Sequence, residues 1–223
     1  MRRISLSALA LPAILAAATA AGAQTPAVPA VPASPASPAS PASPASPASP
    51  ASPAAAAPAP TPTTPAPEVG QPAPDFTAAW ADASGERAAP VKLSDLRGKV
   101  VVLAFYPKDR SSGCTAELTR FRDEHATLFG PDVVVLPISV DSVATHASWA
   151  KEMSFPFALV ADPSLTVAEQ YGSRMSGRNT SSRTVFVIDK AGNVAWRDLR
   201  FNALAENAYT ALAAAVRQAR GAE

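Results

Sequence analysis

Cysteine is almost absent from this sequence, which has one, Cys114, in 223 residues. A lone thiol cannot pair within its own chain, so the disulfide frameworks common in secreted domains are excluded. Histidine is also scarce: His125 and His146, with one cysteine, are a poor ligand set for zinc. No glycine-rich phosphate loop is present, so no nucleotide site is indicated. The sequence therefore predicts no bound metal or cofactor.

Excess charge is lacking too. Nineteen Lys and Arg residues face eighteen Asp and Glu residues, which gives a formal net charge of +1. Without a basic run, the chain offers no reason to expect nucleic acid or anionic membranes as partners. After the N-terminus, no apolar run is long enough to cross a bilayer.

Residues 1–23 have the layout of a secretory signal. The basic Arg2-Arg3 precedes an apolar run from Leu6 to Ala20, and Ala21-Gly22-Ala23 offers a small-residue cleavage site. An uncleaved anchor is the alternative, although the run is short for the roughly twenty residues of a bilayer span. We predict cleavage after Ala23, no membrane span thereafter, and a periplasmic or secreted protein.

Residues 24–67 lack charge altogether and consist mostly of Ala, Pro and Ser. The triplet Ala-Ser-Pro repeats without interruption from Ala33 to Pro53. Such a segment has too little apolar surface to offset the entropy of ordering, and its regular prolines favour extended polyproline II. The prediction is a disordered linker that acts as a spacer.

Residues 68–223 are long enough for one domain with a substantial core. The branched apolar run Val100–Phe105 predicts a buried strand, which Pro107 ends before a polar loop at 108–113. From Cys114 onward the apolar residues take helical spacing. Cys114 therefore lies at the start of a helix, where unpaired N–H groups and the helix dipole favour a thiolate. We expect reactive chemistry at this residue.

Other segments alternate between strand and helix patterns. Strands are predicted at 76–80, 88–93, 133–140, 157–160, 184–188 and 194–199, and helices at 142–153, 164–171 and 202–220. This order predicts an α/β domain with a mixed central sheet and helices on both faces. Sites in such sheets lie at the carboxyl ends of the strands, where Cys114 falls.

The segment from Pro107 to Cys114 matches the Pro-x-x-x-Thr/Ser-x-x-Cys signature of peroxiredoxins. The longer phrases FYPKD, GCTAEL and FRD resemble the bacterioferritin-comigratory or PrxQ branch of the AhpC/TSA superfamily, as do APDF, LSDLRGK and RTVFVIDKAG elsewhere in the domain. The resemblance implies a thioredoxin-like fold. It also implies thiol-dependent reduction of hydrogen peroxide or organic hydroperoxides, in antioxidant defence.

The resemblance also assigns roles to residues. It makes Cys114 the peroxidatic cysteine and Arg183 the arginine that reaches its thiolate. Ser111 stands where the family has a Thr or Ser that hydrogen-bonds the peroxide, and Pro107 would limit solvent access. Glu117 matches a position that steadies the arginines, although an exposed helical glutamate remains an alternative.

The chain departs from the family at Thr119, where many PrxQ members carry a resolving cysteine. Since no second cysteine exists, the sulfenic acid formed on Cys114 must be reduced by an outside thiol. A thioredoxin-like or glutaredoxin-like protein, glutathione or a second copy of the chain would serve. The resemblance implies a monomer or weak dimer.

Two other interpretations stay open at this stage. The segment Ser111-Ser112-Gly113-Cys114 could be the remnant of a Cys-x-x-Cys motif in a thioredoxin-like thiol–disulfide protein with a single active-site cysteine. Against this, such proteins carry a proline before the strand that faces the cysteine, whereas this chain has Arg183. The third interpretation is a non-catalytic binding module displayed on the Ala-Ser-Pro stalk.

Overall fold

The apolar run predicted as the central strand forms β5 (Val100–Phe105), and all six of its residues are buried. β5 pairs in parallel with β6 (Val133–Ser139) and antiparallel with β8 (Thr184–Ile188). Its even-numbered residues enter one hydrophobic core and its odd-numbered residues enter another. A strand covered on both faces must be apolar throughout, which explains its uninterrupted run of hydrophobic residues.

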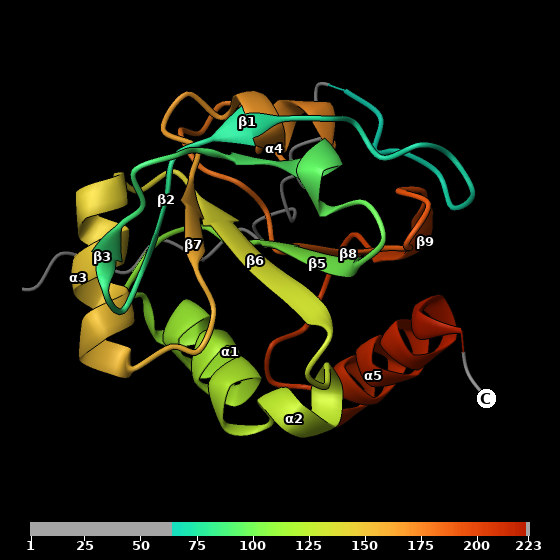
Figure 1. Cartoon of the computed structure of the whole chain (residues 1–223). Coiled ribbons are helices and arrows are strands. Elements are labelled where there is room, and N and C mark those ends of the chain that lie inside the picture. The colour runs from blue at the N-terminus through green and yellow to red at the C-terminus, as the bar shows by residue number, and fades with distance from the viewer. Residues whose placement is uncertain (1–63, 222–223) are drawn as a thin grey trace, which may run out of the picture. The chain divides into compact units, whose positions relative to one another are not determined.

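A computed structural model describes residues 64–221, and the predicted signal and most of the predicted linker lie outside these residues. In this part of the chain, a seven-stranded sheet has the order β3-β2-β7-β6-β5-β8-β9 (Figure 1). A separate two-stranded sheet pairs β1 with β4. The other strands are β1 (Thr77–Ala78), β2 (Trp80–Asp82), β3 (Gly85–Glu86), β4 (Val91–Lys92), β7 (Leu159–Ala161) and β9 (Val194–Asp198). Both parallel and antiparallel pairs occur, so the predicted mixed sheet is confirmed.

Helices cover both faces of this sheet, as predicted (Figure 1). The first core contains buried side chains from α1 (Ser112–Asp123), α2 (His125–Leu128), α3 (Val143–Met153) and α5 (Glu206–Arg220). The second lies beneath α4 (Thr166–Gln170) and the short 3-10 helix η1 (Leu93–Leu96). Within residues 64–221, no helix is both long enough and apolar enough to cross a bilayer.

Several predicted boundaries are wrong near the N-terminus of the domain. The single strand expected at 76–80 is two strands, since the chain passes from the small sheet to the main sheet between β1 and β2. The strand expected at 88–93 shrinks to β4. Pro90, just before β4, has no N–H to donate to a ladder.

Two predicted helices begin later than expected. α5 starts at Glu206 rather than at Asn202, because the Asn202 side chain accepts a hydrogen bond from the Leu204 N–H at 3.0 Å and holds a turn there. α4 starts at Thr166, with Leu165 rather than the expected Ser164 as its N-cap residue, because Leu165 adopts a left-handed conformation with φ of 58°.

The first described residues run along the outer side of β9. The Gly70 N–H donates to the Val194 carbonyl at 2.8 Å, and the Val194 N–H donates to the Gln71 carbonyl at 2.9 Å. The Arg197 guanidinium donates to the carbonyls of Ala66 and Pro67. The last residues of the predicted linker therefore lie against the domain.

Candidate active site

Cys114 occupies the first turn of α1, directly after the loop that leaves β5. Ser111 is the N-cap residue, with extended backbone angles, and its carbonyl accepts the Thr115 N–H at 2.8 Å. Cys114 is completely buried, although it lies at the carboxyl end of the central strand. The sequence therefore places the sulfur where the positive end of the helix dipole acts on it.

Arg183 reaches the sulfur from the neighbouring strand. The register of β5 and β8 pairs Phe105 with Thr184, so the residue before β8 lies beside the loop after β5. The Arg183 Nη2 donates a hydrogen bond to Cys114 Sγ at 3.3 Å. Gly113 leaves room for this approach, since a Cβ atom there would stand 3.2 Å from Nη2.

Glu117 holds the other side of the guanidinium. It lies one turn after Cys114 on α1, is fully buried, and accepts a hydrogen bond from Arg183 Nη1 through Oε2. Burial raises the pKa of Glu117 to about 7, and Arg183 opposes part of this rise. Of the two interpretations left open for Glu117, the buried partner of the arginine is therefore the one observed.

Burial lowers the pKa of Arg183, but the two groups that bind the guanidinium have a larger, opposite effect. Glu117 and Cys114 together raise the pKa of the guanidinium above its ordinary value. The arginine therefore remains a permanent cation beside the sulfur. Glu117 Oε1 has no hydrogen-bond partner among the described residues.

Ser111 and Pro107 lie in the same loop, but neither forms a hydrogen bond with the sulfur. Ser111 is exposed, and its hydroxyl donates to the Lys108 carbonyl at 3.1 Å. Pro107 is half-buried, and its carbonyl accepts a hydrogen bond from the Thr180 hydroxyl at 2.7 Å. The structure thus brings all four predicted site residues to one end of the sheet.

Sequence reasoning did not single out the residues that hold this loop. The hydroxyls of Thr180 and Ser181 donate to the carbonyls of Pro107 and Tyr106, both at 2.7 Å. On the other side, the loop residue Asp109 is buried against α3. Polar residues in a loop give no such signal, because loops are usually solvated.

Other cations near the site have partners of their own. Arg110 pairs with Glu152 of α3 at 2.9 Å. Arg120 pairs with Glu124 and Glu206 and stacks over the Tyr209 ring at 3.8 Å from its centroid. Among the described residues, Arg183 is thus the cation recorded in contact with the sulfur.

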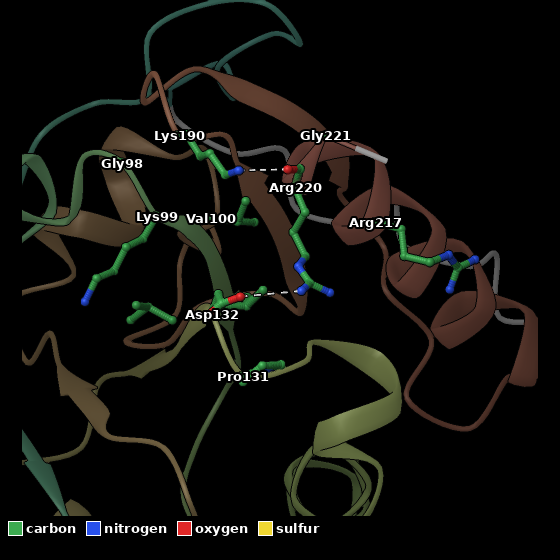
Figure 2. Close-up of a pocket in the computed structure, with 11 residues that line it drawn as sticks. Gly98, Lys99, Val100, Pro131, Asp132, Lys190, Arg217, Arg220 and Gly221 are labelled. Atoms are coloured by element: carbon green, nitrogen blue, oxygen red, sulfur yellow. Dashed lines mark hydrogen bonds and ion pairs between the residues drawn. The ribbon is translucent and has the colours of Figure 1, made fainter. Parts of the chain in front are cut away.

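A wide cationic pocket lies at the opposite end of β5 (Figure 2). Lys99, Lys190, Arg217 and Arg220 line it, and Arg220 stands 3.6 Å from Asp132. Because it borders the first residue of β5 rather than the last, it is separate from the site of Cys114. Within residues 64–221, no cluster of three or more His, Cys, Asp or Glu side chains could hold a metal ion.

A cysteine held by an arginine at the end of the central strand is the arrangement that the peroxiredoxin signature implied, and solved structures of that class share this fold. The crystal structure of peroxidoxin BcpB from Mycobacterium tuberculosis aligns with a TM-score of 0.58 at 29% identity, over 70% of this chain and 99% of that one. The AhpC structure from Enterococcus faecalis aligns at 0.60 over 70% and 98%; its 22% identity speaks for the fold alone.

Sequence comparisons identify the family to which this chain belongs. The profile of the AhpC/TSA family matches residues 69–197. The putative peroxiredoxin bcp of Coxiella burnetii is 44% identical over 131 residues, which cover 56% of this chain and 83% of the relative. Peroxiredoxin Bcp of Bacillus subtilis is 36% identical over 141 residues, covering 60% and 87%. The chain belongs to the AhpC/TSA family. It is a thiol-dependent peroxidase of the Bcp branch with a single cysteine.

The raised pKa of Glu117 predicts a pH-dependent stability. Between pH 4.5 and 7, the folded protein binds a proton at Glu117 that the unfolded chain releases, so the free energy of unfolding should fall as pH rises through this window. Glu117→Gln should remove this component. Urea unfolding of the reduced protein at pH 5 and pH 7.5 measures it.

The exposed Glu206→Gln is the matched control, because it removes a carboxylate from the solvent side of the same region. It should leave the wild-type pH dependence in place. A Glu117→Gln protein whose stability varies with pH as much as that of the wild type would contradict the prediction.

Proposed function

We propose that Cys114 reduces hydrogen peroxide or organic hydroperoxides through a cysteine sulfenic acid that an external thiol recycles. The hydrogen bond from Arg183 to the sulfur carries this proposal, because it sets a permanent cation where charge is lost from sulfur and gained by oxygen. The burial of the sulfur and the absence of a second cysteine support the remaining steps of the proposed mechanism.

In the first step the Cys114 thiolate attacks the terminal oxygen of the peroxide. A sulfur–oxygen bond forms as the oxygen–oxygen bond breaks. The sulfur is oxidised to a sulfenic acid, and the leaving oxygen takes up a proton as an alcohol or water. Arg183 stabilises the charge on both the attacking sulfur and the departing oxygen.

Glu117 sets the orientation of that guanidinium. With Nη1 bound to Glu117 and Nη2 to the sulfur, the planar fork cannot turn away without breaking a buried interaction. Ser111 and Pro107 complete the proposed site at the loop. To reach a bound peroxide, the exposed Ser111 hydroxyl has to leave the Lys108 carbonyl, and the half-buried Pro107 lies in the same loop.

Regeneration must come from outside the chain. A reductant thiol attacks the sulfenic sulfur, which releases water and leaves a mixed disulfide, and a second thiol then restores Cys114 and departs as a disulfide. Thr119 occupies the place of a resolving cysteine on α1 and cannot supply this thiol. Because Cys114 is fully buried, the first turn of α1 has to open for a protein thiol to reach it.

Replacing the sulfur tests the first step. Cys114→Ser should lose peroxide consumption completely. Wild-type protein treated with one equivalent of hydrogen peroxide should gain one oxygen atom by intact-mass spectrometry, and thioredoxin, glutaredoxin or glutathione should remove it. Full turnover by Cys114→Ser would overturn the assignment. An oxidised protein that none of these thiols restores would overturn the external-thiol step alone.

Replacing the arginine tests the electrostatic role. Arg183→Ala should slow the second-order reaction of Cys114 with hydrogen peroxide by about 10²–10³-fold, the loss typical when one oxyanion-stabilising donor is removed. Stopped-flow kinetics measures this rate. Arg174→Ala is the matched control, since Arg174 pairs with Glu169 at 2.9 Å and should react at the wild-type rate. Equal rates for the two variants would remove Arg183 from the proposed site.

The location outside the cytoplasm is also a proposal, supported by the signal pattern in residues 1–23. When the full chain is expressed in a Gram-negative host, the protein should reach the periplasm and begin at Gln24. Cell fractionation with N-terminal sequencing tests this. A protein that keeps Met1 and stays in the cytoplasm would contradict it.

A further inference from the structure

A second polar cluster lies beneath the loop that carries Cys114. It joins Tyr106 and Asp109 of the loop to His146 of α3, and all three residues are almost fully buried. The Tyr106 hydroxyl donates to Asp109 Oδ1 at 2.6 Å, and Asp109 Oδ2 lies 2.9 Å from His146 Nδ1. None of these groups takes part in the chemistry proposed above.

The hydrogen bonds of His146 require one proton in the bond at each of its two ring nitrogens. Its Nε2 lies 3.1 Å from the Val160 carbonyl oxygen, which can only accept, so Nε2 must carry a proton. Its Nδ1 faces a carboxylate oxygen, so a second proton must lie between Nδ1 and Asp109. The pair therefore keeps one proton more than a neutral histidine and an ionised aspartate would hold together.

This extra proton makes the pair neutral as a whole, which suits its burial. A lone carboxylate in this setting would be costly, and Tyr106 alone would be its donor. Burial and then Asp109 raise the pKa of Tyr106, so its hydroxyl stays a donor. Two other charged groups lie nearby. Asp141 accepts a hydrogen bond from the Asp109 N–H, and Arg110 pairs with Glu152.

Asp109 anchors the loop through its backbone as well. Its N–H donates to Asp141 Oδ2 at 2.7 Å, just past the end of β6. The next residue, Arg110, adopts a left-handed conformation with φ of 60°, which a non-glycine residue holds only when its surroundings enforce it. Ser111 then caps α1. A shift at Asp109 therefore passes directly to the turn that carries Cys114.

We propose that the proton-sharing pair Asp109–His146 positions the Cys114 loop for reaction with peroxide, with both residues acting as positioning residues. The pair ties the loop to α3 and β7, on the side opposite the Thr180 and Ser181 hydroxyls. The inference rests on Cys114 as the reacting group. Its test includes a spectroscopic readout that does not depend on activity.

Two substitutions separate the hydrogen bonds from the charge. Asp109→Asn can keep every bond: its oxygen accepts from Tyr106, its amide donates to Nδ1, and a neutral His146 still donates to Val160. His146→Phe keeps an aromatic ring but removes both donors. His125→Phe is the matched control, because the other histidine of the chain stacks on Phe157 instead of facing the site.

The first measurement is ¹⁵N NMR of the histidine rings in the reduced protein at pH 7. His146 should show two protonated ring nitrogens, or one strongly hydrogen-bonded proton shared with Asp109, and Asp109→Asn should show only one ring proton, on Nε2. The His125→Phe spectrum assigns the signals. A wild-type His146 with one ring proton and no proton shared with Asp109 would overturn the proposal, even if Cys114 proved to be a peroxidase.

The second measurement is the rate of Cys114 oxidation by hydrogen peroxide. His146→Phe should lower it on the order of 10²-fold, the cost of roughly a 1 Å misplacement of a reacting group. Asp109→Asn should stay within about threefold of the wild type, and His125→Phe should match it. A wild-type rate in His146→Phe would overturn the positioning role. If His146→Phe does not fold, Asp109→Ala, which removes the side-chain hydrogen bonds to Tyr106 and His146, should show the loss instead, and a wild-type rate there would overturn the positioning role.

Discussion

One guanidinium holds the site together. Arg183 spans two buried groups, the carboxylate of Glu117 and the sulfur of Cys114, which lie a helical turn apart on α1. Because both groups bind the same guanidinium, the contact that Arg183 makes with one of them constrains its contact with the other. Burial raises the pKa of Glu117 to about 7 even with this cation beside it. Other features of the site hold these three groups in position.

The pairing of strands in the sheet brings Arg183 to Cys114. Because β8 pairs antiparallel with β5, the residue that enters β8 meets the loop that leaves β5, however far apart they stand in the chain. The apolar composition of β5 thus has a functional consequence: it fixes a strand buried on both faces, and the strand fixes where Arg183 and Cys114 meet. Hydroxyls on one side and the Asp109–His146 pair on the other fasten the loop between them.

Local sequence patterns predicted which segments form strands and helices better than they predicted which side chains contact one another. The buried β5, the helix after Cys114 and the mixed sheet follow from hydrophobic periodicity, which depends on neighbouring residues. Arg183 could be placed only through the family signature, because a strand end carries no local sign of the group it faces. The bond between Asp109 and His146 joins residues 37 positions apart and left no trace in the sequence. Short strands such as β1 and β4 were misjudged, because they depend on tertiary pairing.

The N-terminal segment along β9 has a consequence for self-association. At Val194, backbone groups of the outermost strand are already bound to Gly70 and Gln71, and prolines occupy much of this segment. At the other margin of the sheet, β3 has only two residues. Among residues 64–221, a neighbouring molecule could therefore not pair with the start of β9 without displacing Gly70 and Gln71, and β3 offers only two residues for such pairing.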